Sequence, residues 1–173
     1  MGAIVLPPIE VELYAGAQKL VESDKAVTFE GRLRMGAIGV AARFTQFREP
    51  VADSLMSTLS LDLWSVAASY RFRVSADIEL EPELGVAGLR YAGDGQMPLT
   101  DSGGVAGLVM RARLGSSAAL VGSGRVFAMS ETGNAIEGRV GVAVGPLQLS
   151  YRSCKFDAGP ALEGPEVGLG FRF

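Results

Sequence analysis

Apolar residues alternate with polar or small residues along most of this 173-residue chain, from residue 9 to its end. A side-chain period of two is typical of strands with one apolar face, and no stretch sustains the 3.6-residue period of a helix. The pattern therefore predicts an all-β protein with ten strands, at 9–20, 26–35, 37–48, 57–72, 78–91, 104–114, 118–129, 135–144, 147–155 and 164–173.

The connections between these strands fall into two sets that alternate strictly along the chain. The acidic or polar set comprises 21–25, 48–54, 92–103, 130–134 and 157–164. The other set is mostly tighter and comprises Met35-Gly36, 73–77, 115–117 and Gly145-Pro146. Strict alternation indicates antiparallel strands with both chain ends on the short-turn side. We expect a single domain, 1–173, that forms a closed antiparallel barrel of ten strands, with eight strands as the alternative.

The positions between the apolar residues are rich in charge. If the apolar face of each strand, formed by every second residue, points outward, ten of the 16 basic residues point inward together with eight carboxylates. A soluble core cannot hold so many charges, because each unpaired buried charge is very costly, whereas a barrel in lipid can have a polar lumen. The residues expected in this lumen charge network are Glu10, Glu12, Arg32, Arg34, Arg43, Arg71, Glu79, Arg111, Arg113, Arg125, Glu137, Arg139, Arg152, Glu166 and Arg172, and Glu30, Glu81 and Glu83 share their parity.

Antiparallel topology also predicts which inward charges are neighbours. The expected pairs are Arg71 with Glu79, Glu79 with Arg113, Arg152 with Glu166, and Arg172 with Glu10 and Glu12, which face Arg34 and Arg32. Arg125 and Arg139 fit less well, since they carry the same charge. Pro82 lies within a predicted strand, where it loses a ladder hydrogen bond, so either a bulge lies there or the strand starts later.

Aromatic residues of outward parity lie at two depths. Near the polar loops these residues are Phe29, Phe44, Trp64 and Tyr151, and near the short turns they are Tyr70, Phe72, Phe171 and Phe173. Aromatic side chains gather at the two interfaces of a membrane. The two sets are therefore expected to form two girdles around a transmembrane β-barrel.

The chain ends in V-x-L-x-F-x-F, from Val167 to Phe173. With the girdles and the alternating loops, this ending resembles the bacterial outer-membrane β-barrel superfamily, and the resemblance covers nearly the whole chain. It implies a location in the bacterial outer membrane, contact with outer-membrane lipid, and a signal peptide that has been removed, since MGAIVLPPI lacks a positive segment. It further implies that the barrel-assembly machinery reads an insertion signal formed by Val167, Leu169, Phe171 and Phe173.

The composition limits the chemistry of the protein. The chain has no histidine, which removes the commonest general base and metal ligand, and its one cysteine is Cys154. We expect no enzymatic activity, no catalytic residue, no cofactor and no metal. A net charge of −3 offers no electrostatic footprint for nucleic acid. The longest run without a charged residue is the 12-residue stretch 140–151, which is shorter than the roughly 20 residues of a transmembrane helix.

Three functions remain open on these observations. In the first, ion pairs fill the lumen and the barrel has an envelope or interaction role, with a protein partner at its loops or outer face. In the second, the lumen is a narrow porin-like channel for ions or small solutes. In the third, the barrel is soluble and carries a ligand like a lipocalin, with the apolar parity inward. We expect the first, because side chains can nearly fill the lumen of a barrel this small.

Overall fold

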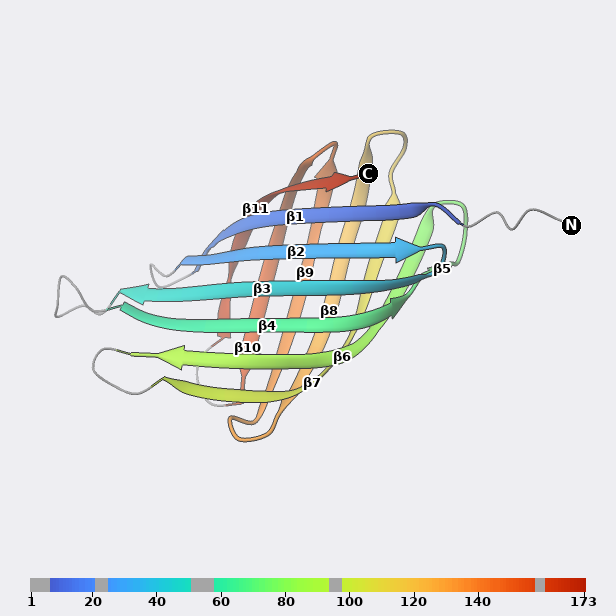
Figure 1. The fold of residues 1–173 in the computed structure, drawn as a ribbon. Coiled ribbons are helices and arrows are strands. Elements are labelled where there is room, and N and C mark those ends of the chain that lie inside the picture. The colour runs from blue at the N-terminus through green and yellow to red at the C-terminus, as the bar shows by residue number, and fades with distance from the viewer. Residues whose placement is uncertain (1–6, 21–24, 51–57, 94–97, 158–160) are drawn as a thin grey trace, which may run out of the picture.

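The computed structural model describes residues 7–20, 25–50, 58–93, 98–157 and 161–173. Within these ranges no helix is long and apolar enough to cross a membrane. The regular structure consists of strands (Figure 1). They are β1 (Ile9–Lys19), β2 (Lys25–Met35), β3 (Ile38–Pro50), β4 (Thr58–Tyr70), β5 (Phe72–Arg73), β6 (Ile78–Ala92), β7 (Leu99–Arg113), β8 (Ala118–Met129), β9 (Asn134–Val144), β10 (Leu147–Phe156) and β11 (Ala161–Arg172).

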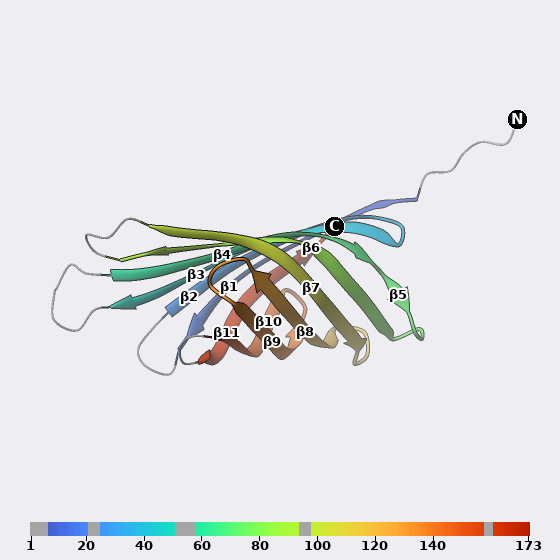
Figure 2. The same ribbon diagram turned by 90° about the horizontal axis from the view of Figure 1, so that it is seen from below.

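The strands form one antiparallel sheet that curves round and closes on itself (Figures 1 and 2). Neighbours along the chain pair in turn, β4 pairs with β6, and β11 pairs with β1 to close the ring. The two-residue β5 continues the line of β4 along β6. The structure is thus a ten-stranded closed barrel with one short extra strand, which confirms the predicted fold. The eight-stranded alternative is wrong.

Pro82 accounts for the break between β4 and β5. Ser69 lies opposite Glu83, and Phe72 lies opposite Leu80, so one register continues across the break. Pro82 falls between these pairs and has no N–H to donate, which interrupts the partner strand. Both predicted alternatives are wrong, because the register leaves no room for a bulge at Pro82 and β6 already begins at Ile78.

Two strands begin at least three residues earlier than the sequence predicts. β7 begins at Leu99 rather than at 104, and β11 begins at Ala161 rather than at 164. Leu99 already pairs with Tyr91 of β6, so this hairpin extends into the polar segment that was assigned to a loop. Polar residues such as Asp101 resemble loop residues in the sequence. A strand segment that extends beyond the apolar outer surface of the barrel does not need an apolar face of its own.

Glycine begins each of the two tightest turns. Gly36 joins β2 to β3 with φ of +67°, and Gly145 joins β9 to β10 with φ of +56°. These values lie in the left-handed region that side chains other than that of glycine rarely adopt. Both turns lie at the end of the barrel where β1 begins, which fixes this end as the short-turn end.

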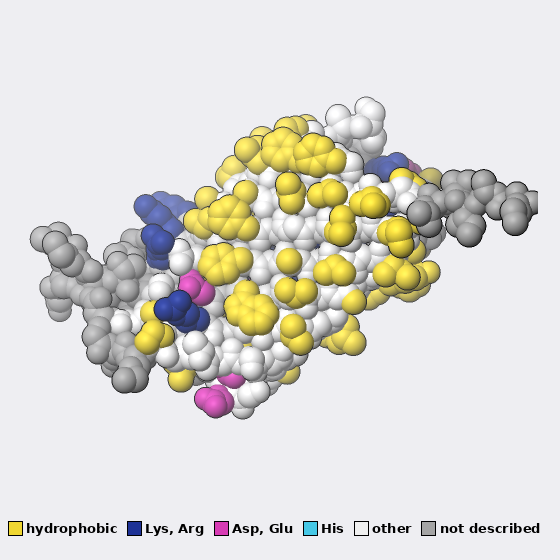
Figure 3. All heavy atoms as spheres, viewed as in Figure 1, with side chains coloured by type: hydrophobic (Ala, Val, Ile, Leu, Met, Phe, Trp, Pro, Cys, Tyr) yellow, Lys and Arg dark blue, Asp and Glu magenta, His cyan; other side chains and the backbone are white. Residues whose placement is uncertain are grey.

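The apolar side chains at alternate positions of the strands cover the outside of the barrel. Figure 3 shows hydrophobic side chains across the face made by β1 to β4, with charged side chains toward the ends of the strands. All eight aromatic residues expected at the membrane interfaces are exposed, from 37% for Phe44 to 73% for Phe173. The soluble lipocalin-like alternative is therefore wrong, since it requires these side chains to point inward.

Candidate functional site

The lumen contains a buried carboxylate, Glu137 of β9, surrounded by three guanidinium groups. Its oxygens pair with Arg43, with Arg152 at 2.8 Å and with Arg125 at 3.4 Å. Arg152 is fully buried and also donates to the Thr28 hydroxyl at 2.6 Å. Four strands therefore meet at one carboxylate, and loss of its charge leaves three buried guanidinium groups without their shared partner.

Arg32 of β2 has the opposite arrangement, one guanidinium among three carboxylates. It lies 2.6 Å from Glu30, 2.6 Å from Glu83 and 3.0 Å from Glu81. Arg125 connects this group to Glu137, since its Nε donates to Glu83 at 2.9 Å. The two groups thus form one continuous network through the middle of the lumen.

A third set of ion pairs lies toward the short-turn end. Arg34 pairs with Glu12 at 2.8 Å. Glu10 lies between Arg71 at 2.8 Å and Arg172 at 2.7 Å. Arg172 also lies 3.5 Å from Glu12, so strand closure brings together the neighbours that were expected. Apart from Arg34, these side chains are more exposed than those around Glu137, from 9% for Arg71 to 33% for Arg172.

The pairs predicted around Glu79 are wrong. Glu79 pairs with Arg73 at 3.3 Å, and Arg71 instead reaches Glu10 across the lumen. Glu79 lies opposite Arg111 in the ladder, not opposite Arg113. Arg113 is exposed at the end of β7 and has no ion pair within the described ranges. The register between β6 and β7 differs by two residues from the one inferred from the centre of the turn.

The register between β10 and β11 also differs by two residues from the prediction. Arg152 lies opposite Gly164, and Ser150 lies opposite Glu166. Arg152 and Glu166 still approach to 3.7 Å, diagonally across the two strands. In the ladder between β8 and β9, Arg125 lies opposite Glu137, whereas in the ladder between β9 and β10, Arg139 lies opposite Arg152.

In the ladder between β8 and β9, Arg139 lies opposite Ser123, two positions along β9 from the residue opposite Arg125. Its guanidinium lies 3.4 Å from Glu30 and 3.5 Å from Glu166. It also covers the ring of Tyr14 at 4.8 Å, and the Tyr14 hydroxyl donates to Glu166. Sequence reasoning did not single out Tyr14, although its inward parity was a usable signal.

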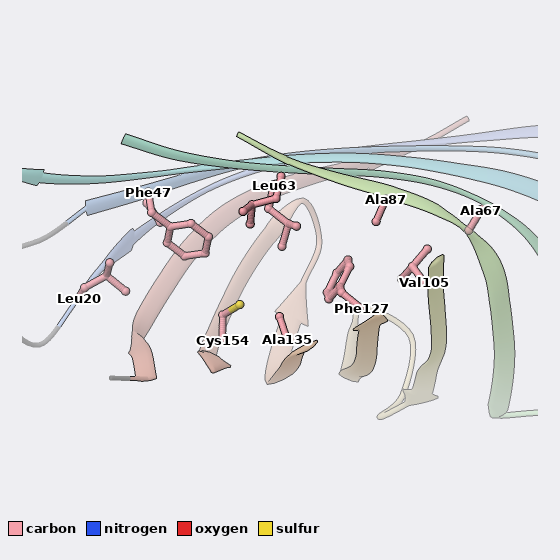
Figure 4. Packing of buried hydrophobic residues seen from close by; sticks show 11 residues of the cluster. Leu20, Phe47, Leu63, Ala67, Ala87, Val105, Phe127, Ala135 and Cys154 are labelled. Atoms are coloured by element: carbon pink, nitrogen blue, oxygen red, sulfur yellow. The ribbon is translucent and has the colours of Figure 1, made fainter. Parts of the chain in front are cut away.

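An apolar cluster fills the loop-side part of the lumen (Figure 4). Phe127 is 1% exposed and Phe47 is 4% exposed, and the guanidinium of Arg152 lies 5.2 Å from the Phe47 ring. This cluster was not predicted, although Phe47 lies on the same strand face as Arg43, and Phe127 on the same face as Arg125. The members of the cluster are Leu20, Ala26, Phe47, Leu63, Ala67, Ala87, Leu89, Val105, Phe127, Ala135 and Cys154.

The loop between β8 and β9 is held from both sides by aspartates. Asp101 accepts from the backbone N–H of Glu131 at 2.9 Å and of Thr132 at 2.7 Å, and from the Thr132 hydroxyl at 2.8 Å. Asp157 accepts from the backbone N–H of Asn134 at 2.7 Å. The loop end of the barrel therefore presents at least one loop of fixed shape.

Asp101→Ala is expected to lower the free energy of unfolding by more than its control does, because it leaves the N–H groups of Glu131 and Thr132 and the Thr132 hydroxyl without their shared acceptor. Urea unfolding of the refolded protein measures this change. Asp62→Ala is the matched control, since Asp62 accepts one side-chain hydrogen bond, from Gln46 at 2.9 Å. Equal losses in the two variants would show that Asp101 does not hold the loop.

No protein-family model and no curated protein matches this sequence. A major outer membrane protein from Thermus thermophilus has a similar structure, with a TM-score of 0.54 and 13% identity over 96% of this chain and 100% of that one. The attachment invasion locus protein Ail of Yersinia pestis aligns with a TM-score of 0.48 and 16% identity, over 96% of this chain and 99% of that one. Neisserial surface protein A gives 0.42 and 13%, over 97% of each chain. The likeness to the Thermus protein is one of fold: this chain is a closed antiparallel β-barrel with an apolar exterior and a charged lumen.

Proposed function

We propose that this protein is a non-conducting, non-enzymatic barrel that serves the cell envelope through its loop end and its outer face. The observation that carries this proposal is the double obstruction of the lumen. Glu137 and Arg152 are at most 1% exposed in the charge network, and Phe127 is 1% exposed in the apolar cluster on the loop side. An ion that crosses the barrel has to displace both layers.

The same network supports a role without catalysis. Each of the eight inward carboxylates lies within 4.0 Å of at least one guanidinium. A general base or nucleophile needs a carboxylate that can reach a substrate, and these carboxylates are engaged in ion pairs. Within the described ranges no group of three or more His, Cys, Asp or Glu residues is placed to hold a metal ion.

The outer face offers contacts with lipid and with proteins of the envelope. A groove of about 580 Å³ runs across its aromatic part, between the rings of Phe29, Phe44 and Trp64. Its size and apolar walls suit the acyl chain of a lipid. We assign recognition by the barrel-assembly machinery to the outward side chains of the last strand and the residue after it, namely Val167, Leu169, Phe171 and Phe173.

Single-channel recording in a planar bilayer tests the proposal. The refolded protein is expected to give no discrete current steps, because the network and the cluster both block the path. Insertion is verified separately by flotation with vesicles and by the shift in gel mobility on boiling. Reproducible steps from inserted protein would contradict the proposal and favour the narrow porin-like channel.

A further inference from the structure

Three basic residues lie side by side on the outer face, at the loop-side ends of β1, β2 and β3. Lys19 lies directly opposite Lys25 in the ladder between β1 and β2, and Lys25 lies directly opposite Arg48 in the ladder between β2 and β3. All three side chains are exposed. Figure 3 shows basic side chains at the loop-side end of this face, beside the hydrophobic ones. We call these three residues the basic row.

The basic row is confined to one side of the barrel. On the opposite side, the exposed outward positions near the loops are uncharged, namely Ser102 of β7, Ala128 of β8 and Asn134 of β9. Like charges that lie directly opposite one another destabilise a sheet. An anion beside the basic row therefore stabilises the barrel on this side and has no equivalent place on the other.

Hydrogen bonds hold one end of the basic row in place. Arg48 Nε donates to Gln46 Oε1 at 2.8 Å, and Gln46 Nε2 donates to Asp62 at 2.9 Å. Asp62 in turn lies opposite Arg90 in the next ladder. A guanidinium has several N–H donors, so Arg48 can donate to a phosphate oxygen while its Nε stays bonded to Gln46.

The aromatic groove of the outer face lies on the same strands as the basic row. Phe29 is four residues from Lys25 on β2, and Phe44 is four residues from Arg48 on β3. Both rings line the groove, which continues to Phe171 near the short-turn end. Four strand residues span about 13 Å. A lipid whose headgroup lies at the basic row can therefore place an acyl chain in the groove.

We propose that the basic row and the groove together bind a phospholipid with a net negative headgroup, taken from the surrounding bilayer. The three cations contact the headgroup phosphate, and the aromatic rings contact the acyl chain. Basic side chains at the level of the headgroups attract anionic lipids, and a guanidinium matches the geometry of a phosphate. This inference rests on the outer-face role proposed above and names the class of lipid that this face selects.

Trp64 provides the readout, because it is the only tryptophan of the chain and lines the groove. The refolded barrel is placed in phosphatidylcholine vesicles that contain a rising fraction of a lipid with brominated acyl chains, which quench tryptophan on contact. Brominated phosphatidylglycerol is expected to quench Trp64 at a much lower fraction than brominated phosphatidylcholine. Lys25→Gln is expected to reduce this preference about fivefold, the effect of one cation near the membrane surface on an anionic lipid.

Lys155→Gln is the matched control. Lys155 is also an exposed cation at the loop-side end of the outer face, but it lies on β10, opposite Ala161 and Ile136. The groove is lined by other residues, so this variant is expected to keep the preference of the wild type. If Lys25→Gln does not refold, as judged by the shift in gel mobility on boiling, Lys19→Gln replaces it.

Equal quenching by the two brominated lipids in the wild type, or an unchanged preference in Lys25→Gln, would overturn this inference and leave the proposed function in place. The absence of quenching by either lipid would overturn both, because the outer face would then not be in contact with lipid. Added sodium chloride is expected to reduce the preference, since salt screens exposed charges. The channel recordings concern the lumen and are independent of these results.

Discussion

Glu137→Gln is expected to lower the free energy of unfolding by about 3–5 kcal/mol, the range for breaking a buried ion pair from one side. The substitution keeps the size of the side chain and removes its charge. It leaves the guanidiniums of Arg43, Arg125 and Arg152 facing one another without their shared carboxylate. Urea unfolding of the refolded barrel, followed by the fluorescence of Trp64, measures the loss.

Glu79→Gln is the matched control for this experiment. Glu79 lies at the short-turn end, and its ion pairs are with Arg73 at 3.3 Å and Arg172 at 4.0 Å, whose side chains are 65% and 33% exposed. An ion pair in contact with water contributes about 0–1 kcal/mol, so the control is expected to change stability by no more than that. Similar losses in both variants would show that the central carboxylate has no special role.

Leu149→Arg is expected to lower the free energy of unfolding by about 2–4 kcal/mol, the cost of a cation at the middle of the lipid face of a barrel. Leu149 is 55% exposed on β10, between the depths marked by Tyr151 and by the turn at Gly145-Pro146. The charge would have to stay in hydrocarbon or distort the bilayer around it. Folding titrations into phosphatidylcholine vesicles measure the change.

Leu147→Arg provides the control at another depth. Leu147 is also exposed on the outer face, at 42%, but it follows the short turn directly. An arginine there reaches the interface, so the expected cost is about 0–1 kcal/mol. If both positions tolerate arginine equally well, the apolar parity does not face lipid.

The direction of each side chain was predictable from sequence, whereas the register of two hairpins was not. Leu33 and Arg34 point to opposite faces because the strand period is two, and this rule needs no knowledge of the partner strand. A shift of one residue would move every side chain to the wrong face. A shift of two preserves all faces, so parity cannot detect it, and Glu79 was assigned to Arg113 instead of Arg111 for this reason.

Contacts across the lumen were also outside the reach of the sequence. Arg43 and Glu137 lie on β3 and β9, which are not neighbours in the sheet. Ladder reasoning pairs adjacent strands, so it cannot find a contact that depends on the diameter and tilt of the barrel. The apolar cluster was missed because an alternating pattern identifies the apolar face and hides apolar residues, such as Phe127, on the other face.

The reactivity of Cys154 tests the central claim most directly, because this single cysteine has the parity of Arg152 and is 0% exposed beside the charge network. A charged, membrane-impermeant maleimide is expected to leave Cys154 unlabelled in the folded barrel and to label it fully in urea. Cys154→Ser/Ser117→Cys, with its thiol in the exposed short turn, is expected to react in both states. Protection of Cys154 is the result expected of a sealed, charge-filled lumen. Rapid labelling of the folded wild type would contradict this account, since it would mean that the lumen is open to water or that the charged parity faces outward.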